Sequence, residues 1–166
     1  MTNIRELITT HSKAEKVLKL AGQVGSELGK QVYVVGGFVR DIFMQKISKE
    51  IDLMVVGDGI NFAEALAKQL AVKKIIPFKE FSTAKIPHKE IGIDVAAARI
   101  ESYDEKSRKP TKVIYTDLKG DLVRRDFTIN AMAVDILPES FGEIHDPYNG
   151  ILDLQAKQIT TPLDPD

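Results

Sequence analysis

An apolar run that stops at two glycines constrains the fold more than any other feature of the sequence. Residues 31–35 (QVYVV) predict a buried strand, which Gly36 and Gly37 end abruptly before FVRDIFM, a stretch that suits a short helix. Because glycine lacks a Cβ, such a turn brings backbone amides close to a bound anion, and Arg40 in the first helical turn can grip phosphate oxygens. The alternative is a tight strand–helix turn with a surface arginine.

The triplet Glu50-Ile51-Asp52 opens a second predicted strand, at residues 51–56. Residues i and i+2 of a strand share a face, so both carboxylates project together while Ile51 enters the core. Two adjacent carboxylates repel each other, and a hard cation such as Mg²⁺ between them relieves the repulsion. A solvated strand edge would carry the same triplet, so the pattern alone leaves both interpretations open.

A lone aspartate, Asp94, lies in the segment GIDVAAAR at residues 92–99, which otherwise predicts a buried strand. It is a turn residue, a structural acid with satisfied hydrogen bonds, or a third metal ligand.

The segment DLVRRDFTINAMA, residues 121–133, largely coincides with a stretch at 118–132 that predicts two short helical pieces. Adjacent residues lie about 100° apart on a helix, so we expect Arg124 and Arg125 on different faces, one in a cleft and its neighbour against a carboxylate. Asp126 suits a cap, and Asn130 can hydrogen-bond a sugar or the backbone. The alternative is a helix–cap–helix junction with solvated arginines.

The remaining patterns complete a mixed α/β (α+β) fold, with early strands joined by helices and later strands in close succession. We expect helices at 12–28 and 61–70, strands at 74–78, 81–86, 91–97 and 133–137, and a mobile polar loop at 101–111. With 166 residues, 43% of them apolar, the chain fits one domain. Residues 1–30 would form an N-terminal helical segment, and residues 156–166 would begin a linker.

Composition excludes several classes of protein. The formal net charge of −1 argues against coating nucleic acid by overall attraction, although it leaves room for a local basic site. The absence of cysteine excludes disulfides and thiolate zinc sites. No signal peptide and no long apolar segment is present, so we expect a cytoplasmic protein without a membrane partner.

The motifs together, in this order and spacing, resemble the class II nucleotidyltransferases, which include bacterial tRNA CCA-adding enzymes and poly(A) polymerases. They are GGFVRD (36–41), E-x-D (50–52), IDVAAAR (93–99) and RRDFTINAMA (124–133). The resemblance covers residues 31–163 and implies a polymerase β-like head, with a mixed sheet and flanking helices.

The resemblance also implies roles for individual residues. The catalytic metal ligands would be Glu50, Asp52 and Asp94. The nucleotide-binding residues would be Gly36, Gly37, Arg40, Arg124, Arg125, Asp126 and Asn130. Asp41 would orient Arg40 or the turn, and the loop at 101–111 matches a flexible loop of the family. Glu50 departs from the aspartate of many members, but it remains a hard oxygen ligand one methylene longer.

The implied reaction uses two Mg²⁺ ions and transfers a nucleotide from ATP or CTP to the 3′ end of an RNA, here a tRNA. Family members continue into helical regions that select the base and grip the tRNA, so we expect a catalytic head with little turnover by itself. Two alternatives remain: a poly(A) polymerase of the same fold, and a module that binds nucleotide or RNA without catalysis.

Overall fold

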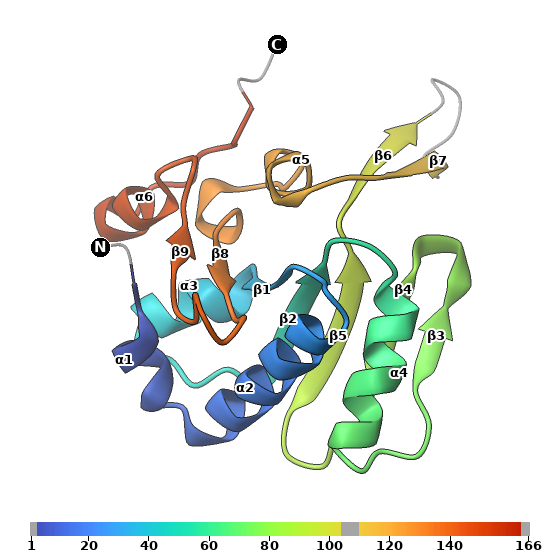
Figure 1. Ribbon diagram of the computed structural model, residues 1–166. Coiled ribbons are helices and arrows are strands. Elements are labelled where there is room, and N and C mark those ends of the chain that lie inside the picture. The colour runs from blue at the N-terminus through green and yellow to red at the C-terminus, as the bar shows by residue number, and fades with distance from the viewer. Residues whose placement is uncertain (1–2, 104–109, 164–166) are drawn as a thin grey trace.

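The computed structural model describes residues 3–103 and 110–163 as one mixed α/β domain (Figure 1). The helices are α1 (Arg5–Thr9), α2 (Ser12–Glu27), α3 (Gly37–Phe43), α4 (Gly59–Gln69), α5 (Leu118–Val123) and α6 (Gly150–Ala156), with 3₁₀ turns η1 (Lys79–Phe81) and η2 (Thr128–Asn130). The strands are β1 (Val32–Val35), β2 (Glu50–Val55), β3 (Ile76–Phe78), β4 (Thr83–Ile86), β5 (Gly92–Ala97), β6 (Arg99–Tyr103), β7 (Pro110–Tyr115), β8 (Ala133–Asp135) and β9 (Ile144–His145).

The main sheet has seven strands in the order β3-β4-β5-β2-β1-β8-β9, and β6 and β7 form a separate two-stranded sheet. β2 and β5 pair in parallel, while the other neighbours in the main sheet are antiparallel. Parallel strands need a crossover, and α4 lies within the connection from β2 to β5. The expected mixed sheet with flanking helices is therefore confirmed.

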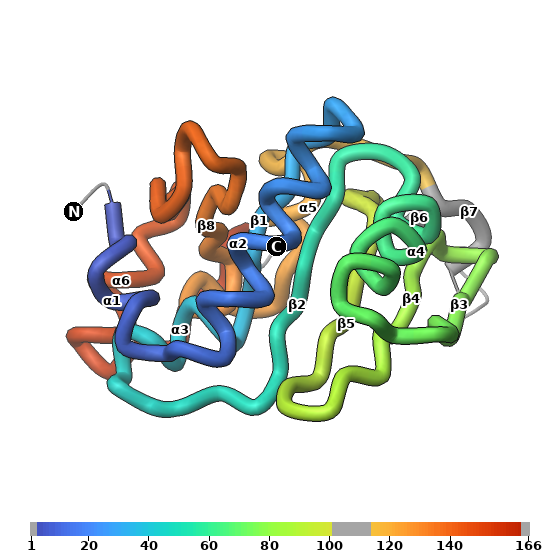
Figure 2. The backbone as a smooth tube through the Cα atoms, turned by 60° about the horizontal axis from the view of Figure 1, so that its bottom comes forward, coloured from blue at the N-terminus to red at the C-terminus, as the bar shows by residue number. Residues whose placement is uncertain are grey.

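The two faces of the sheet have different roles. Helices α2 and α4 lie side by side on one face (Figures 1 and 2), where they bury Leu18 and Phe62 against Ile51 and other alternate strand residues. On the opposite face a smaller cluster packs Leu122 of α5 against residues that include Met54. Part of this second face stays accessible at the start of β2, where Glu50 and Asp52 are exposed.

Helix boundaries follow local chemistry. α2 ends before Gly29, whose φ of +65° is a left-handed conformation that glycine adopts without strain. α4 begins after Asp58, whose side chain accepts a hydrogen bond of 3.0 Å from the Asn61 amide.

Two expectations need correction, and one helix was not predicted. The proposed loop at 101–111 overlaps β6, which extends to Tyr103, and β7, which begins at Pro110; residues 104–109 lie outside the described residues. α6 ends at Ala156, directly where we expected a linker to start, and its own helical character was not predicted. Arg124 and Arg125 follow the last residue of α5 instead of lying within a helix. Within the described ranges, no helix combines the length and the apolar character needed to cross a membrane.

Candidate nucleotide and metal site

Two of the predicted metal ligands are direct neighbours across the parallel strand pair. Asp52 of β2 is in register with Asp94 of β5, and Glu50 is in register with Gly92. Residues in register on adjacent strands lie about 5 Å apart and point to the same side of the sheet. Glu50, Asp52 and Asp94 therefore share the face opposite α2 and α4.

The electrostatics of this carboxylate group are mutually unfavourable. Loss of solvent is the largest cause that raises the pKa of Asp52 above its ordinary value, although the residue as a whole is exposed. The negative charge of Asp94 raises this pKa further, and that of Glu50 adds to the effect. Arg125 and Lys85 act in the opposite direction and lower it. A group of carboxylates held together in this way favours a cation.

The protein supplies one such cation itself. Nζ of Lys85, on β4, lies 3.5 Å from Oδ1 of Asp94, and β4 places the two residues in register. Both side chains are solvent-exposed, at 59% and 38%, so the ion pair is weak and easily exchanged. Sequence reasoning missed Lys85, although its alternation with the buried Ala84 and Ile86 would have placed it on the exposed face.

The side chains of the three acids are not arranged in advance as a metal-binding site. Among residues 3–103 and 110–163, no group of three His, Cys, Asp or Glu side chains is arranged to hold a metal ion. In chemistry the set still fits a divalent cation, because hard carboxylate oxygens on one face carry excess negative charge beside a displaceable lysine.

The glycine turn lies at the end of β1. Gly36 has φ +71° and ψ −135°, a backbone conformation that side-chain-bearing residues avoid, and it caps α3. Its amide donates to the carbonyl of Met132 at 3.2 Å. The expectation of bare amides at this turn is therefore wrong for Gly36, whose N–H is already engaged.

Arg40 is held in place by two neighbours. Its Nε and Nη2 donate to Oδ1 of Asp41 at 3.1 and 3.0 Å, and its Nη1 donates to Oδ1 of Asn130 at 2.9 Å. The expectation that Asp41 orients Arg40 is confirmed. The side-chain oxygen of Asn130 accepts a hydrogen bond from Arg40, so Asn130 supports this arginine.

A buried aspartate organises the second pair of arginines. Asp121 is only 1% exposed; its Oδ1 accepts from Nη2 of Arg124 at 3.2 Å, and its Oδ2 accepts from Nη2 of Arg125 at 3.0 Å. The backbone amide of Arg99 donates to Oδ1 at 3.1 Å. The expectation that the two arginines diverge is wrong, because both leave the end of α5 toward one carboxylate. The spacing i, i+3 and i+4 was the available signal for Asp121.

Two of the arginines, Arg125 and Arg40, lie close to the glycine turn. A Cβ on Gly36 would lie 3.4 Å from Nη1 of Arg125, and one on Gly37 would lie 3.4 Å from Nη2 of Arg40. Arg125 also lowers the pKa of Asp52, so its charge acts on the carboxylates as well as on the turn. Gly36, Gly37, Arg40 and Arg125 are thus brought together beside the acids.

Asp126 is the predicted site residue that the structure brings into least contact. It is exposed, and it forms no hydrogen bond or ion pair with the described part of the chain. Nothing in its surroundings fixes its side chain toward the glycine turn.

Comparison with known proteins gives this arrangement a family. Residues 32–160 match the family described as the poly A polymerase head domain. The chain belongs to this family. A-adding tRNA nucleotidyltransferase of Geobacter sulfurreducens is 42% identical over 144 residues, which are 86% of this chain and 16% of the relative. The CCA-adding enzyme of Bacillus pumilus is 38% identical over 140 residues, 84% of this chain and 33% of the relative.

Solved structures agree with this family. An apo form of a CCA-adding enzyme superposes with a TM-score of 0.85 at 34% identity, covering 97% of this chain and 38% of that chain. A CCA-adding enzyme in complex with ATP gives 0.83 at 33% identity, with coverage of 97% and 37%. The Thermotoga maritima CCA-adding enzyme in complex with tRNA gives 0.81 at 33%, with coverage of 97% and 36%. The chain thus spans well under half the length of the proteins it matches.

Proposed function

We propose that this domain transfers nucleotides from nucleoside triphosphates to the 3′ hydroxyl of a tRNA, as the catalytic head of a CCA- or A-adding nucleotidyltransferase. One observation carries the proposal: a carboxylate pair in register, Asp52 and Asp94, lies beside a glycine turn that has Arg40 and Arg125 close to it. The relatives' names and the tRNA and ATP complexes of its structural neighbours support the same substrates.

Arginines carry the proposed triphosphate site. Arg40 is fixed by Asp41 and Asn130, and Arg125 is fixed by Asp121, so their charges are oriented before the ligand arrives. Preorganised guanidinium groups bind phosphate oxygens bidentately and lose little entropy when they do so. The glycines keep the space between the arginines free of side chains, so that the triphosphate can approach the backbone. We assign Asn130 and Asp41 to the support of Arg40.

Glu50, Asp52 and Asp94 are the proposed ligands of Mg²⁺. When bound there, divalent ions lower the pKa of the RNA 3′ hydroxyl and stabilise the charge on the departing pyrophosphate. The carboxylates fix the position of the reacting groups, and Arg125 and Lys85 balance the negative charge around them. Catalysis of this kind rests on positioning and electrostatics, so it requires no protein nucleophile.

The test uses the full-length protein that carries this head. Incubation with tRNAs that lack A, CA or CCA at the 3′ end, with ATP and CTP singly and together, should yield addition that stops at the completed CCA terminus. Asp52→Asn and Asp94→Asn should each reduce the rate by at least about 10²-fold, with the tRNA still bound. Activity that survives in both variants at the wild-type level would contradict the assignment of the carboxylates.

The same assay separates the alternatives. Long untemplated runs of A would identify a poly(A) polymerase, whose head domain gives the family its name. Binding of ATP and RNA with no transfer under any condition would identify a binding module without catalysis.

A further inference from the structure

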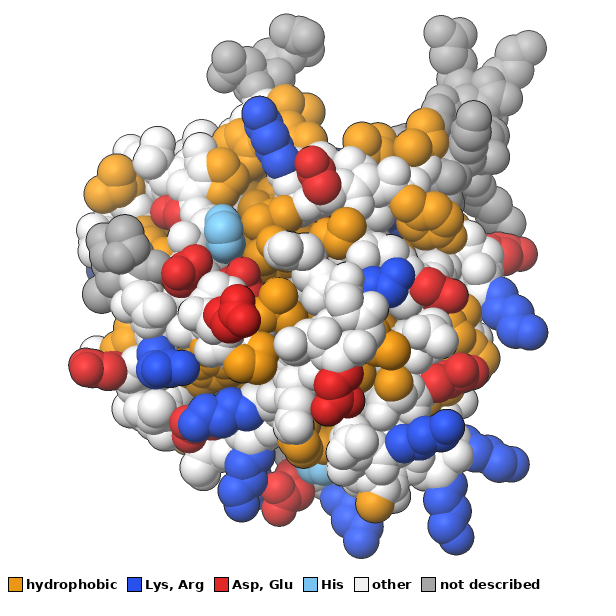
Figure 3. Space-filling model, in the orientation of Figure 1, with side chains coloured by type: hydrophobic (Ala, Val, Ile, Leu, Met, Phe, Trp, Pro, Cys, Tyr) orange, Lys and Arg blue, Asp and Glu red, His pale blue; other side chains and the backbone are white. Residues whose placement is uncertain are grey.

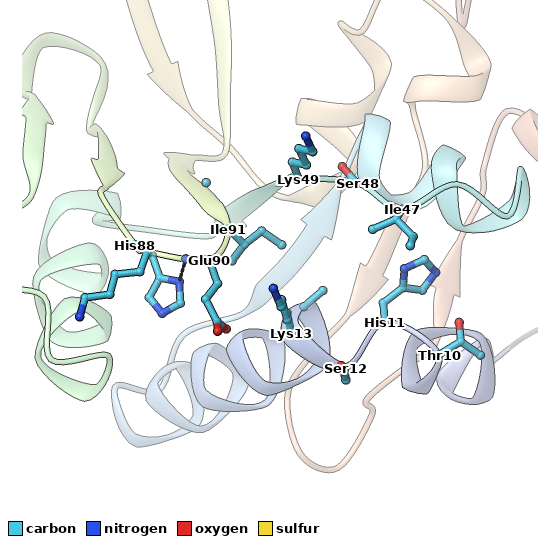
Figure 4. Close-up of a pocket in the computed structure, with 13 residues that line it drawn as sticks. Thr10, His11, Ser12, Lys13, Ile47, Ser48, Lys49, His88, Glu90 and Ile91 are labelled. Carbon is cyan, nitrogen blue, oxygen red and sulfur yellow. Dashed lines mark hydrogen bonds between the residues drawn. The ribbon is translucent and has the colours of Figure 1, made fainter.

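Two adjoining depressions lie at the edge of the domain where β2 and β5 begin. The first, of about 530 Å³, lies between the α1–α2 junction and the segments that precede the two strands (Figure 4). The second, of about 590 Å³, lies beside the chain that follows α4. His88 and Lys89 line both, so the depressions adjoin at these two residues.

The surface of the two depressions concentrates positive charge. The depressions are lined by Lys13, Lys49, Lys73, Lys74 and Lys89, named here the lysine surface. All five lysines are exposed, and the only acidic residue in either lining is Glu90. Lys and Arg side chains gather along the lower edge of the view in Figure 3. Such a cluster contrasts with the net charge of −1 for the whole chain.

These lysines have no ion-pair partner among the residues that the structure describes, in the ranges 3–103 and 110–163. The backbone amide of Glu90 donates to Nδ1 of His88 at 3.3 Å, which fixes the loop between β4 and β5 (Figure 4). Like charges held close together on a fixed frame are stabilised by an anion that spans them.

The lysine surface adjoins the edge of the sheet at which the strands of the proposed catalytic acids begin, on the side that α2 covers. Lys49 directly precedes Glu50, and its carbonyl accepts the amide hydrogen of Gly92 at 2.9 Å. Gly92 is in register with Glu50. At a strand rise of about 3.3 Å per residue, Lys49 lies about 10 Å along the chain from Asp52. An extended polyanion that passes from the lysine surface around this edge of the sheet can therefore reach the carboxylates.

We propose that the lysine surface binds the phosphate backbone of the RNA whose 3′ end enters the catalytic site. The proposal rests on the proposed function, because that function makes RNA the acceptor. Lysines spread over two depressions match a chain of phosphates better than a single triphosphate. Neither depression is lined by Phe, Tyr or Trp, and five lysines line the two, so contact with phosphates is favoured over base stacking.

Charge reversal in the full-length protein tests the proposal. Lys73→Glu/Lys74→Glu changes the second depression, and Lys79→Glu/Lys157→Glu makes the same change in charge at exposed lysines outside the lysine surface. Binding of tRNA is measured by fluorescence anisotropy at several salt concentrations in an Asp52→Asn background, so that it does not depend on turnover. Steady-state kinetics are measured in the catalytically intact proteins.

The Lys73→Glu/Lys74→Glu variant should bind tRNA at least tenfold more weakly than the control, at about physiological salt. Its slope of log affinity against log salt should fall by about 1.5, since each lost phosphate contact removes roughly 0.7–0.9. The KM for tRNA should rise, while the KM for ATP and the kcat at saturating tRNA stay unchanged. Lys73→Arg/Lys74→Arg should restore binding.

Several outcomes would overturn the proposal. Unchanged tRNA affinity and salt slope would do so, as would equal losses in the Lys79→Glu/Lys157→Glu control. A glutamate polymer is tested in the same binding assay. If its binding depends on the lysine surface while the binding of tRNA does not, the partner of this surface is an acidic protein. If transfer to tRNA persists in any of these cases, the proposed function stands; if tRNA binding depends on the lysines but no transfer occurs, only the proposed function fails.

Discussion

Asp121 and Arg125 form a hydrogen-bonded ion pair of 3.0 Å whose carboxylate is almost completely buried, with the residue 1% exposed. The second oxygen of the same carboxylate accepts hydrogen bonds from Nη2 of Arg124 at 3.2 Å and from the backbone amide of Arg99 at 3.1 Å. A buried carboxylate with these partners has its charge compensated, and it fixes the arginines in return. The positive charge beside Gly36 is thus in place before any nucleotide binds.

Asp121→Asn should weaken both the fold and the binding of ATP. The substitution keeps the size of the side chain but leaves two guanidinium groups beside a neutral amide, at a cost of roughly 1–3 kcal/mol in the free energy of unfolding. Freed from their carboxylate, the arginines lose their orientation, and the affinity for ATP should fall roughly tenfold, which corresponds to about 1.4 kcal/mol. Urea unfolding and calorimetric titration with ATP measure the two effects.

Asp117→Ala is the matched control for this variant. Asp117 caps the same helix, α5, and accepts from the Gly120 amide at 3.0 Å, without contact to either arginine. Loss of the cap should cost about 1 kcal/mol and leave the affinity for ATP intact. Equal losses of ATP affinity in the two variants would mean that Asp121 acts only through stability.

The two glycines of the turn should respond differently to alanine. Gly36→Ala places a Cβ on a residue with φ +71°, so the free energy of unfolding should fall by about 1–3 kcal/mol. Gly37→Ala lies at the first position of α3, where alanine is tolerated, but its Cβ would lie 3.4 Å from Nη2 of Arg40. We expect Gly37→Ala to keep stability within about 1 kcal/mol and to reduce ATP affinity several-fold.

Thermal unfolding and ATP titration of both glycine variants decide this point. A Gly37→Ala protein that binds ATP as well as the wild type would show that Arg40 tolerates the added methyl group or takes no part in binding. A Gly36→Ala protein of unchanged stability would contradict the argument from its backbone conformation.

The sequence predicted the elements whose signals are local. Strand β1, the stop at Gly36, and the shared face of Glu50 and Asp52 follow from periodicity and from the properties of glycine. The juxtaposition of Asp52 and Asp94 does not, because it depends on the parallel register of β2 and β5, which is set by packing across a crossover.

Arg124 and Arg125 illustrate why other parts of the site were not predicted from the sequence. Helical geometry separates adjacent residues by about 100°, but α5 ends at Val123, and the chain beyond it turns both guanidinium groups toward Asp121. The loop expected at 101–111 failed for a related reason. Polar composition predicts exposure, but β6 and β7 gain their stability from backbone pairing, which composition does not record.

Asp52→Asn should produce opposite shifts in stability with and without metal. In EDTA at neutral pH the variant should be slightly more stable than the wild type, by less than about 1 kcal/mol, because it removes a charge that is partly desolvated and that Asp94 repels. Mg²⁺ or Mn²⁺ should raise the melting temperature of the wild type but not that of the variant. A metal-dependent rise of equal size in both proteins would contradict the assignment of Asp52 as a ligand.

The pH dependence of the metal-free protein follows from the same carboxyl. Because the pKa of Asp52 lies above its ordinary value of 3.8 in the folded state, the native protein holds this proton more tightly than the unfolded chain does. The stabilisation from this group is complete below pH 3.8 and is lost as the pH rises through the raised pKa. Measured in EDTA across this interval, the free energy of unfolding of the wild type should therefore fall with pH relative to that of Asp52→Asn.

Lys85→Gln should strengthen metal binding. In the protein without metal, Nζ of Lys85 lies 3.5 Å from Oδ1 of Asp94, so a metal ion must compete with this ammonium for the carboxylate. An exposed ion pair contributes about 0.2–1 kcal/mol, so its removal should tighten the Kd for Mn²⁺ by up to about fivefold and lower stability in EDTA by a similar free energy. Lys85→Arg keeps the charge and should bind Mn²⁺ like the wild type. Calorimetric titration at low ionic strength measures the difference, which should shrink in high salt. Weaker Mn²⁺ binding by Lys85→Gln than by Lys85→Arg would show that Lys85 holds Asp94 in position for the metal instead of competing with it.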